Sequence, residues 1–178
     1  MSGSTNKVCL YAMGVALFVV LTMCLQVPVF ENYYLCLGYV VIAVYCYSFG
    51  PAGGATVGAL GVVIYCLLTN GLRGMPGWAA GNALIGLALG FTFRATKGMR
   101  SKALQWMLNA LAVAVSVAAG ILVVKSCVEQ VLYNQPFLFR AAKNMYAFIA
   151  DVVLLLVSLP VCRKMDEYLH RFVRIHNE

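Results

Sequence analysis

The chain has 178 residues, of which 62% are apolar and only 11% are charged, and its mean hydropathy is +0.85. Soluble domains average roughly 45–50% apolar and about 25% charged residues, so this composition excludes an ordinary water-soluble protein. It indicates a multi-pass membrane protein with one domain, residues 1–178. The formal net charge is +7, but no soluble basic region is present to bind nucleic acid.

The chain begins with a short polar leader that contains Lys7, followed by an uncharged run over 8–27. About 20 apolar residues are enough to cross a bilayer, so we expect a first helix over 8–27. No small-residue cleavage site closes this run, which favours a retained helix over a signal peptide. The polar and aromatic stretch 28–34 is expected to be a loop.

The next two helices are predicted over 34–49 and 51–68, joined by a tight return at Gly50-Pro51. Glycines at 50, 54 and 58 fall four residues apart, and Gly61 follows. A helix with this spacing has one face almost without side chains. Such a face allows another helix to approach closely, which is the way helices pack in lipid.

A loop over 69–76 leads to a helix over 77–93, a basic loop, a helix over 103–124, a longer mixed connection over 125–143, a helix over 144–161 and a charged tail, 163–178. The predicted fold is therefore all-α and integral to the membrane, with six transmembrane helices. Six spans place both termini on one side. Nine of the 13 Lys and Arg residues fall on that side, so we expect both termini to be cytoplasmic.

Catalysis and metal binding have little support. The seven cysteines show no C-x-x-C spacing, and both histidines, His170 and His176, lie in the tail, so no zinc site is expected. There is no Ser-His-Asp set, no paired carboxylates and no Walker A motif. The sequence predicts neither an enzyme nor a resident cofactor or metal.

Polar residues gather in the loops and helix turns that this topology places outside. An outward pocket could be built from them. Asp151 lies inside the last predicted helix, where an ionisable group is costly and marks a functional site by default, although a simple buried carboxyl is the alternative. The candidate substrate-binding residues are Tyr34, Arg73, Trp78, Asn82, Lys143, Asn144, Tyr146 and Asp151.

Three motifs give a resemblance to a known family. The first helix contains Ala12-Met-Gly-Val-Ala16, an AxxxA pattern; Leu37-Gly38-Tyr39 leads to Phe49-Gly50-Pro51 and Gly58; and a Met75-Pro76 pair precedes a glycine-containing helix that reaches Gly90. The chain resembles the substrate-binding S components of energy-coupling factor (ECF) vitamin transporters over about 12–94. Tyr39 departs from the family pattern, because many relatives carry Asp there.

The resemblance implies an S component of a bacterial or archaeal cell membrane that binds a water-soluble vitamin or related metabolite from outside. It implies docking through Ala12 and Ala16 on a transmembrane T (coupling) subunit, which works with two ECF ATPases. On this reading, Trp78 or Tyr34 stacks on a ring, Asn82 and Asn144 supply amide hydrogen bonds, and Arg73 or Lys143 meets an anionic group. The alternative is a non-transporting membrane scaffold of the rod-shape-determining MreD type.

Overall fold

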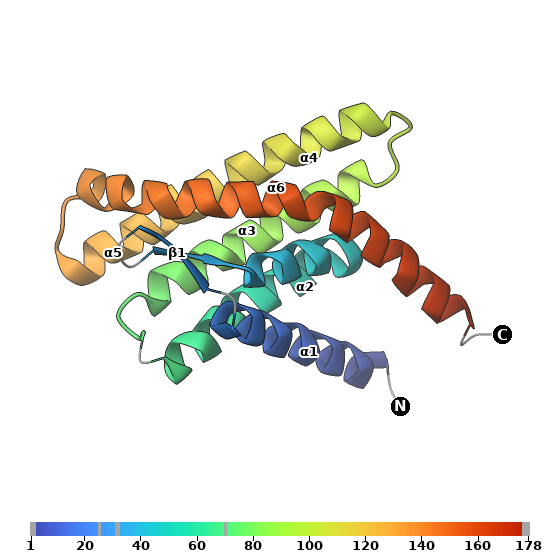
Figure 1. Cartoon of the computed structure of the whole chain (residues 1–178), viewed down its shortest axis with the longest axis horizontal. Coiled ribbons are helices and arrows are strands. Elements are labelled where there is room, and N and C mark those ends of the chain that lie inside the picture. The colour runs from blue at the N-terminus through green and yellow to red at the C-terminus, as the bar shows by residue number, and fades with distance from the viewer. Residues whose placement is uncertain (1–2, 25, 31–32, 70, 176–178) are drawn as a thin grey trace.

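The computed structural model describes the backbone of residues 3–24, 26–30, 33–69 and 71–175, and the side chains of residues 7–24, 36–69 and 71–168. Figure 1 shows helices packed side by side along one long axis, with both ends of the described chain at the right. The elements in chain order are α1 (Gly3–Cys24), β1 (Gln26–Phe30), β2 (Tyr33–Cys36), α2 (Gly38–Leu68), α3 (Met75–Thr96), α4 (Lys102–Val117), the π-helical segment η1 (Ala118–Lys125), α5 (Ser126–Tyr133) and α6 (Phe137–Ile175).

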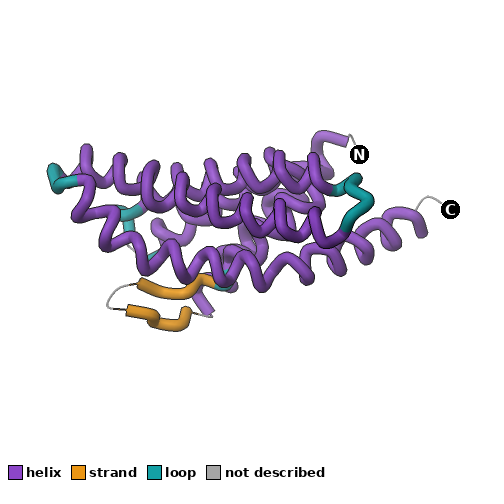
Figure 2. The backbone as a smooth tube through the Cα atoms, turned by 90° about the horizontal axis from the view of Figure 1, so that it is seen from above, coloured by secondary structure: helices purple, strands orange, loops and turns teal. Residues whose placement is uncertain are grey.

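A short β-hairpin stands where the sequence predicts a loop and the start of a helix. β1 pairs with β2 in antiparallel fashion, with Gln26 opposite Cys36 and an irregularity between Pro28 and Phe30. A proline has no N–H to donate, and it is tolerated here because both strands of a two-stranded ribbon are edge strands. Figure 2 shows the hairpin on one side of the helices.

The element α2 reverses its direction at Gly50. Gly50 has φ 77° and ψ −164°, a backbone conformation that favours glycine, and Pro51 follows it. Gly38 and Gly61 both lie against the ring of Phe18 in α1, although a straight helix at about 1.5 Å per residue would separate them by about 35 Å. The predicted helices 34–49 and 51–68 are thus the two arms of one element (Figure 1).

The close helix packing predicted for the glycine face is found: Gly54 and Gly58 lie against α3, and Gly61 lies against Phe18 of α1. A Cβ atom added at Gly86 would overlap the backbone of Gly54, and one added at Gly90 would overlap the backbone at Pro51. On the other side of α3, a Cβ at Gly81 would lie 2.6 Å from the carbonyl oxygen of Gly120 in η1. The glycines therefore bring α3 into backbone contact with both neighbours.

The predicted boundaries of the last two helices are wrong. The helix expected over 103–124 continues through η1 and α5 to Tyr133, and α6 runs from Phe137 to Ile175 in place of the expected 144–161. The mixed connection predicted over 125–143 shrinks to 134–136, where Asn134 ends α5 in a left-handed conformation, φ 54°. Its polar residues had indicated a loop, but they lie on helices that extend beyond the apolar segments.

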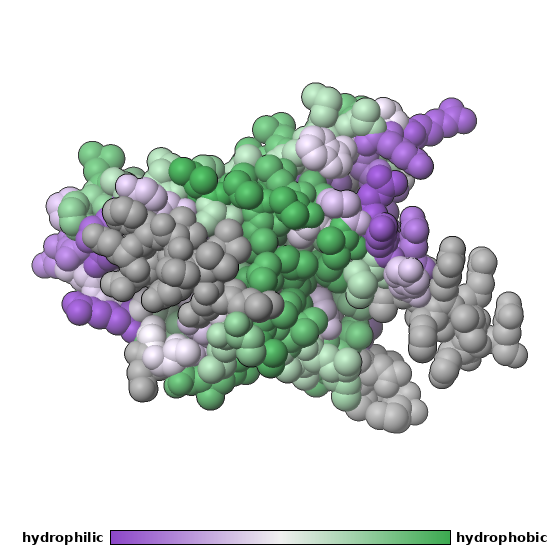
Figure 3. Space-filling view, viewed as in Figure 1, coloured by the Kyte–Doolittle hydropathy of each residue, from purple (hydrophilic) through white to green (hydrophobic). Residues whose placement is uncertain are grey.

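In the described part of the chain, four helices are long and apolar enough to cross a membrane, and they cover 7–24, 38–68, 102–133 and 137–168. The helix α3, which carries four glycines and Asn82, is not among them. The predicted count of six separate spans is therefore not reproduced. Figure 3 shows an apolar band across the visible face, with hydrophilic residues gathered toward both ends, as expected for a membrane protein.

Candidate functional site

Buried polar side chains meet at the end of the bundle opposite the termini. The first group, the Tyr39 cluster, consists of Tyr39 from α2, Trp78 and Asn82 from α3, and Asp151 from α6. The Tyr39 hydroxyl donates to Asn82 Oδ1 at 2.9 Å and accepts from Trp78 Nε1 at 3.0 Å. Asp151 interacts with the same hydroxyl and, electrostatically, with Lys125. Tyr39, Asn82 and Asp151 are all less than 5% exposed.

The Tyr39 hydroxyl is expected to hold this cluster together. In Tyr39→Phe, Asn82 Oδ1 and Trp78 Nε1 lose their partner inside the bundle, at a cost of about 1–3 kcal/mol in the free energy of unfolding. The matched control is Tyr45→Phe, which removes a single bond to the carbonyl oxygen of Leu10. Thermal unfolding in detergent measures both variants. Equal stability of Tyr39→Phe and Tyr45→Phe would contradict this role.

The second group, the Glu129 cluster, consists of Lys125, Ser126, Glu129, Arg140 and Asn144. Asn144 Nδ2 in α6 donates to Ser126 Oγ at 3.0 Å and to Glu129 Oε2 at 3.2 Å. Lys125 Nζ lies 4.0 Å and Arg140 Nη1 lies 3.9 Å from the Glu129 carboxylate. Glu129 is 6% exposed, so these contacts are made largely out of water.

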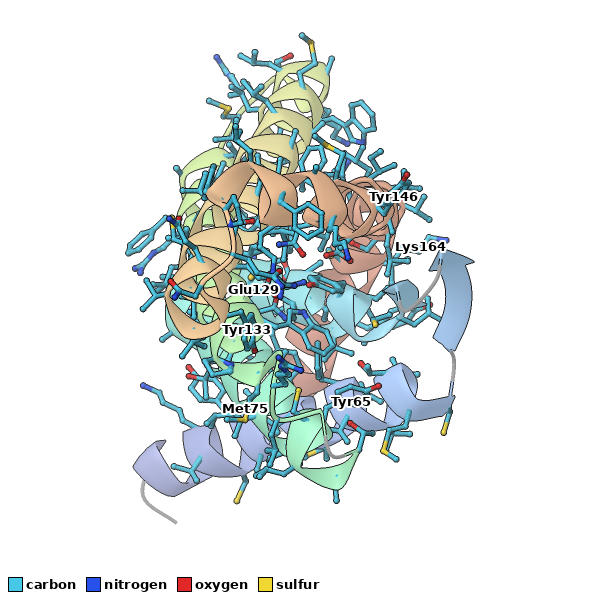
Figure 4. The ribbon with its side chains drawn as sticks, turned by 90° about the vertical axis from the view of Figure 1, so that its left-hand side faces the viewer. Tyr65, Met75, Glu129, Tyr133, Tyr146 and Lys164 are labelled. Carbon is cyan, nitrogen blue, oxygen red and sulfur yellow. The ribbon has the colours of Figure 1, made fainter. Side chains whose placement is uncertain are left out.

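An open pocket of about 380 Å³ adjoins this second group. We call it the Tyr133 pocket; its lining is Arg73, Gly74, Glu129, Tyr133, Gln135 and Arg140. The guanidinium carbons of Arg73 and Arg140 lie 5.2 and 4.9 Å from the centre of the Tyr133 ring. Figure 4 looks onto this end of the bundle, with Glu129 and Tyr133 next to each other near its centre.

The β-hairpin reaches the same region through Cys36. Burial, and then the nearby Asp151 carboxylate, raise the pKa of the Cys36 thiol to about 12. The thiol therefore stays protonated at neutral pH and adds no charge to the site. The hairpin, α2, α3, α5 and α6 thus all contribute to one end of the molecule.

The structure brings five of the predicted site residues together. Trp78, Asn82 and Asp151 belong to the Tyr39 cluster, Asn144 belongs to the Glu129 cluster, and Arg73 lines the Tyr133 pocket.

The other three predicted residues are not among the described members of the two clusters or the pocket. Lys143 is exposed, with Nζ 4.9 Å from the Phe139 ring centre. Tyr146 is 44% exposed and lies toward the edge of the end view (Figure 4). The side chain of Tyr34 lies outside the described residues. The roles of all eight residues in substrate binding remain predictions.

Several polar residues of the site were missed in the sequence. Tyr39 was noticed only as a departure from a family motif. Lys125 and Glu129 were assigned to a connection, although a spacing of four residues between opposite charges is typical of a helix face. Tyr133 was among the outer polar residues from which a pocket was expected, but Arg140 carried no signal of its own, because its role depends on how α5 meets α6.

A separate apolar groove runs between α1 and the second arm of α2. Its volume is about 590 Å³, and its lining includes Ala12, Ala16 and Val20 from α1 with Thr56, Leu60 and Ile64 from α2. The predicted docking residues Ala12 and Ala16 therefore line the same groove. We call it the α1–α2 groove.

Comparison with known proteins agrees with this arrangement. The family model for the ECF-type riboflavin transporter, S component, matches residues 2–165. The chain belongs to this family. The resemblance seen in the sequence is thereby confirmed, and the family is one of transporter components that bind substrate.

The fold of this S component is also found among solved structures. The S-component for biotin from an ECF-type ABC transporter aligns with a TM-score of 0.66 and 15% identity, over 94% of this chain and 95% of that chain. At this identity the likeness shows the fold. No curated protein matches the chain. Neither comparison supports the MreD-like scaffold.

Proposed function

We propose that this chain is the substrate-binding S subunit of an ECF-type ABC importer for a water-soluble vitamin or related small metabolite. One observation carries the proposal: two buried polar clusters and the Tyr133 pocket lie at one end of an otherwise apolar bundle. Polar and ionisable groups are costly inside a membrane protein and are typical of substrate sites. The pocket volume, about 380 Å³, suits a vitamin-sized molecule.

The proposed topology has six crossings, in which the two arms of α2 and the helix α3 each cross once. Both termini are then on the same side, together with the basic loop between α3 and α4. Nine of the 13 Lys and Arg residues belong to this end, which the positive-inside rule places in the cytoplasm. The Tyr133 pocket then opens to the outside of a bacterial or archaeal cell.

The α1–α2 groove is the proposed docking surface for a transmembrane T subunit, which works with two ATPases that hydrolyse ATP. The groove is apolar, and Ala12 and Ala16 are among its lining residues. Helices associate in lipid through close packing of small residues. A surface of this kind allows contact without deep interlocking, as repeated docking and release require.

Asn82→Ala and Asn144→Ala are each expected to weaken ligand binding by about tenfold or more, because lost hydrogen bonds to a buried polar ligand cost about 1.4 kcal/mol or more. Native mass spectrometry of protein purified from its host identifies the ligand, and thermal shift with that ligand measures binding. Riboflavin and biotin are the first two compounds to test, because they name the matched family and the matched structure.

The matched control is Asn109→Ala. Asn109 is also a buried amide, and its Oδ1 accepts from Thr96 Oγ1 at 2.7 Å at the opposite end of the bundle. This variant is expected to bind ligand normally. Wild-type binding by both Asn82→Ala and Asn144→Ala would place the substrate elsewhere in the protein.

A further inference from the structure

We propose that the substrate carries an acidic group, a carboxylate or a phosphate, and that this group binds in the Tyr133 pocket between Arg73 and Arg140. The inference rests on the proposed function and specifies the chemical class of the substrate. It comes from the charge balance, the loose ion pairs and an unpartnered donor at this site.

The charges around the pocket are unbalanced. Arg73 and Arg140 line it together with a single carboxylate, Glu129. Lys125 also lies 4.0 Å from the Glu129 carboxylate. Because Lys125 also interacts electrostatically with Asp151, the charges at the pocket itself are two arginines and one carboxylate. In the described part of the chain Arg73 forms no ion pair, so this excess positive charge is not neutralised at the pocket mouth.

The pairing with Glu129 is also loose. The contacts from Lys125 and Arg140 measure 4.0 and 3.9 Å, beyond the ordinary length of a charge-assisted hydrogen bond, about 2.7–2.9 Å. The close partner of Glu129 Oε2 is the amide of Asn144, at 3.2 Å. Arg140 Nε is buried and has no hydrogen-bond partner among the described residues. A buried donor left in this state is costly unless a ligand supplies the acceptor.

The two guanidinium groups contact the same ring. Both lie within 5.2 Å of the Tyr133 ring centre, an arrangement in which each gains a cation–π contact but the two like charges repel. An anion bound in the pocket that both arginines line would be attracted by both of them. Guanidinium groups bind carboxylate and phosphate through paired hydrogen bonds, so both ligand groups fit this geometry.

The test uses pairs of compounds that differ in the acidic group: biotin with biotinamide, pantothenate with panthenol, and flavin mononucleotide with riboflavin. Dissociation constants are measured by calorimetry on the full chain in detergent. We expect the acidic member of at least one pair to bind about tenfold more tightly or better, the effect of one or two charge-assisted hydrogen bonds. In Arg140→Gln and in Arg73→Gln, this preference is expected to fall to about twofold.

The matched control is Arg100→Gln, which makes the same change in charge at an exposed position near the opposite end and is expected to keep the full preference. Arg73 is exposed, so Arg73→Gln tests the idea even if Arg140→Gln does not fold. If, in every pair that binds, the neutral compound binds as tightly as its acidic partner, the inference is overturned and the proposed function stays supported. If both arginine variants keep the preference for acidic compounds, the assignment of the acidic group to the Tyr133 pocket is overturned. No bound compound in the panel and none co-purifying would contradict the proposed function itself.

Discussion

Gly86→Ala is expected to destabilise the folded protein by about 1–3 kcal/mol, the usual cost of forcing an extra carbon atom into a packed interior. A glycine-to-alanine change inside a helix normally stabilises it by about 1 kcal/mol, so the expected sign is the reverse of the usual one. The reason is the contact between α2 and α3, where the added Cβ would overlap the backbone of Gly54. Backbone atoms cannot rotate away, and the two helices would have to separate.

Thermal unfolding in a single detergent measures this effect, and Gly98→Ala is the matched control. A Cβ atom at Gly98 meets no other atom within 4 Å, so this variant is expected to unfold at the wild-type temperature. Because the Tyr39 cluster joins the same two helices, Gly86→Ala is also expected to weaken ligand binding. A Gly86→Ala protein at least as stable as wild type would show that the helices are not in backbone contact.

The features that the sequence could predict depend on local patterns. The glycine spacing predicts that another helix packs closely against 51–68, because small residues on one helix face allow close packing in lipid; at Gly54 that helix is α3. Asn82 and Asp151 are recognisable because polar groups are rare within apolar segments. Each of these signals is contained in a single helix, and the structure places both residues in the Tyr39 cluster.

The features that could not be predicted depend on how distant segments meet. Tyr39 is one more aromatic residue in an apolar run until α3 places Asn82 and Trp78 against its hydroxyl. The β-hairpin at 26–36 forms through backbone pairing, and the sequence contains no turn motif that would predict it. The polar residues after 125 suggested a loop because the predicted helix was ended where the apolar segment ends. Helices can continue past an apolar segment, and α5 and α6 do so where they line the Tyr133 pocket.

Ala16→Leu is expected to lower vitamin uptake in cells by about tenfold or more, while the purified protein binds ligand normally. The two effects separate because the substitution disturbs packing at a helix interface and leaves the distant substrate site unchanged. Ala16 lies in the α1–α2 groove with Leu60 and Ile64, and a leucine there would fill the space proposed for a helix of the T subunit. The clusters that would hold the substrate involve α2, α3, α5 and α6 rather than α1. Uptake of labelled substrate and calorimetry on the same variant measure the two effects.

Met13→Leu is the matched control because it places the same side chain on α1 outside the groove, at a residue that is 67% exposed. It is expected to keep both uptake and binding. Co-purification with the T subunit separates the possible causes of lost uptake, since blocked docking removes the partner from Ala16→Leu and not from Met13→Leu. Normal uptake by Ala16→Leu would exclude this groove as the docking surface. Loss of ligand binding together with uptake would instead mean that α1 supports the substrate site, and the two functions would then share one region of the fold.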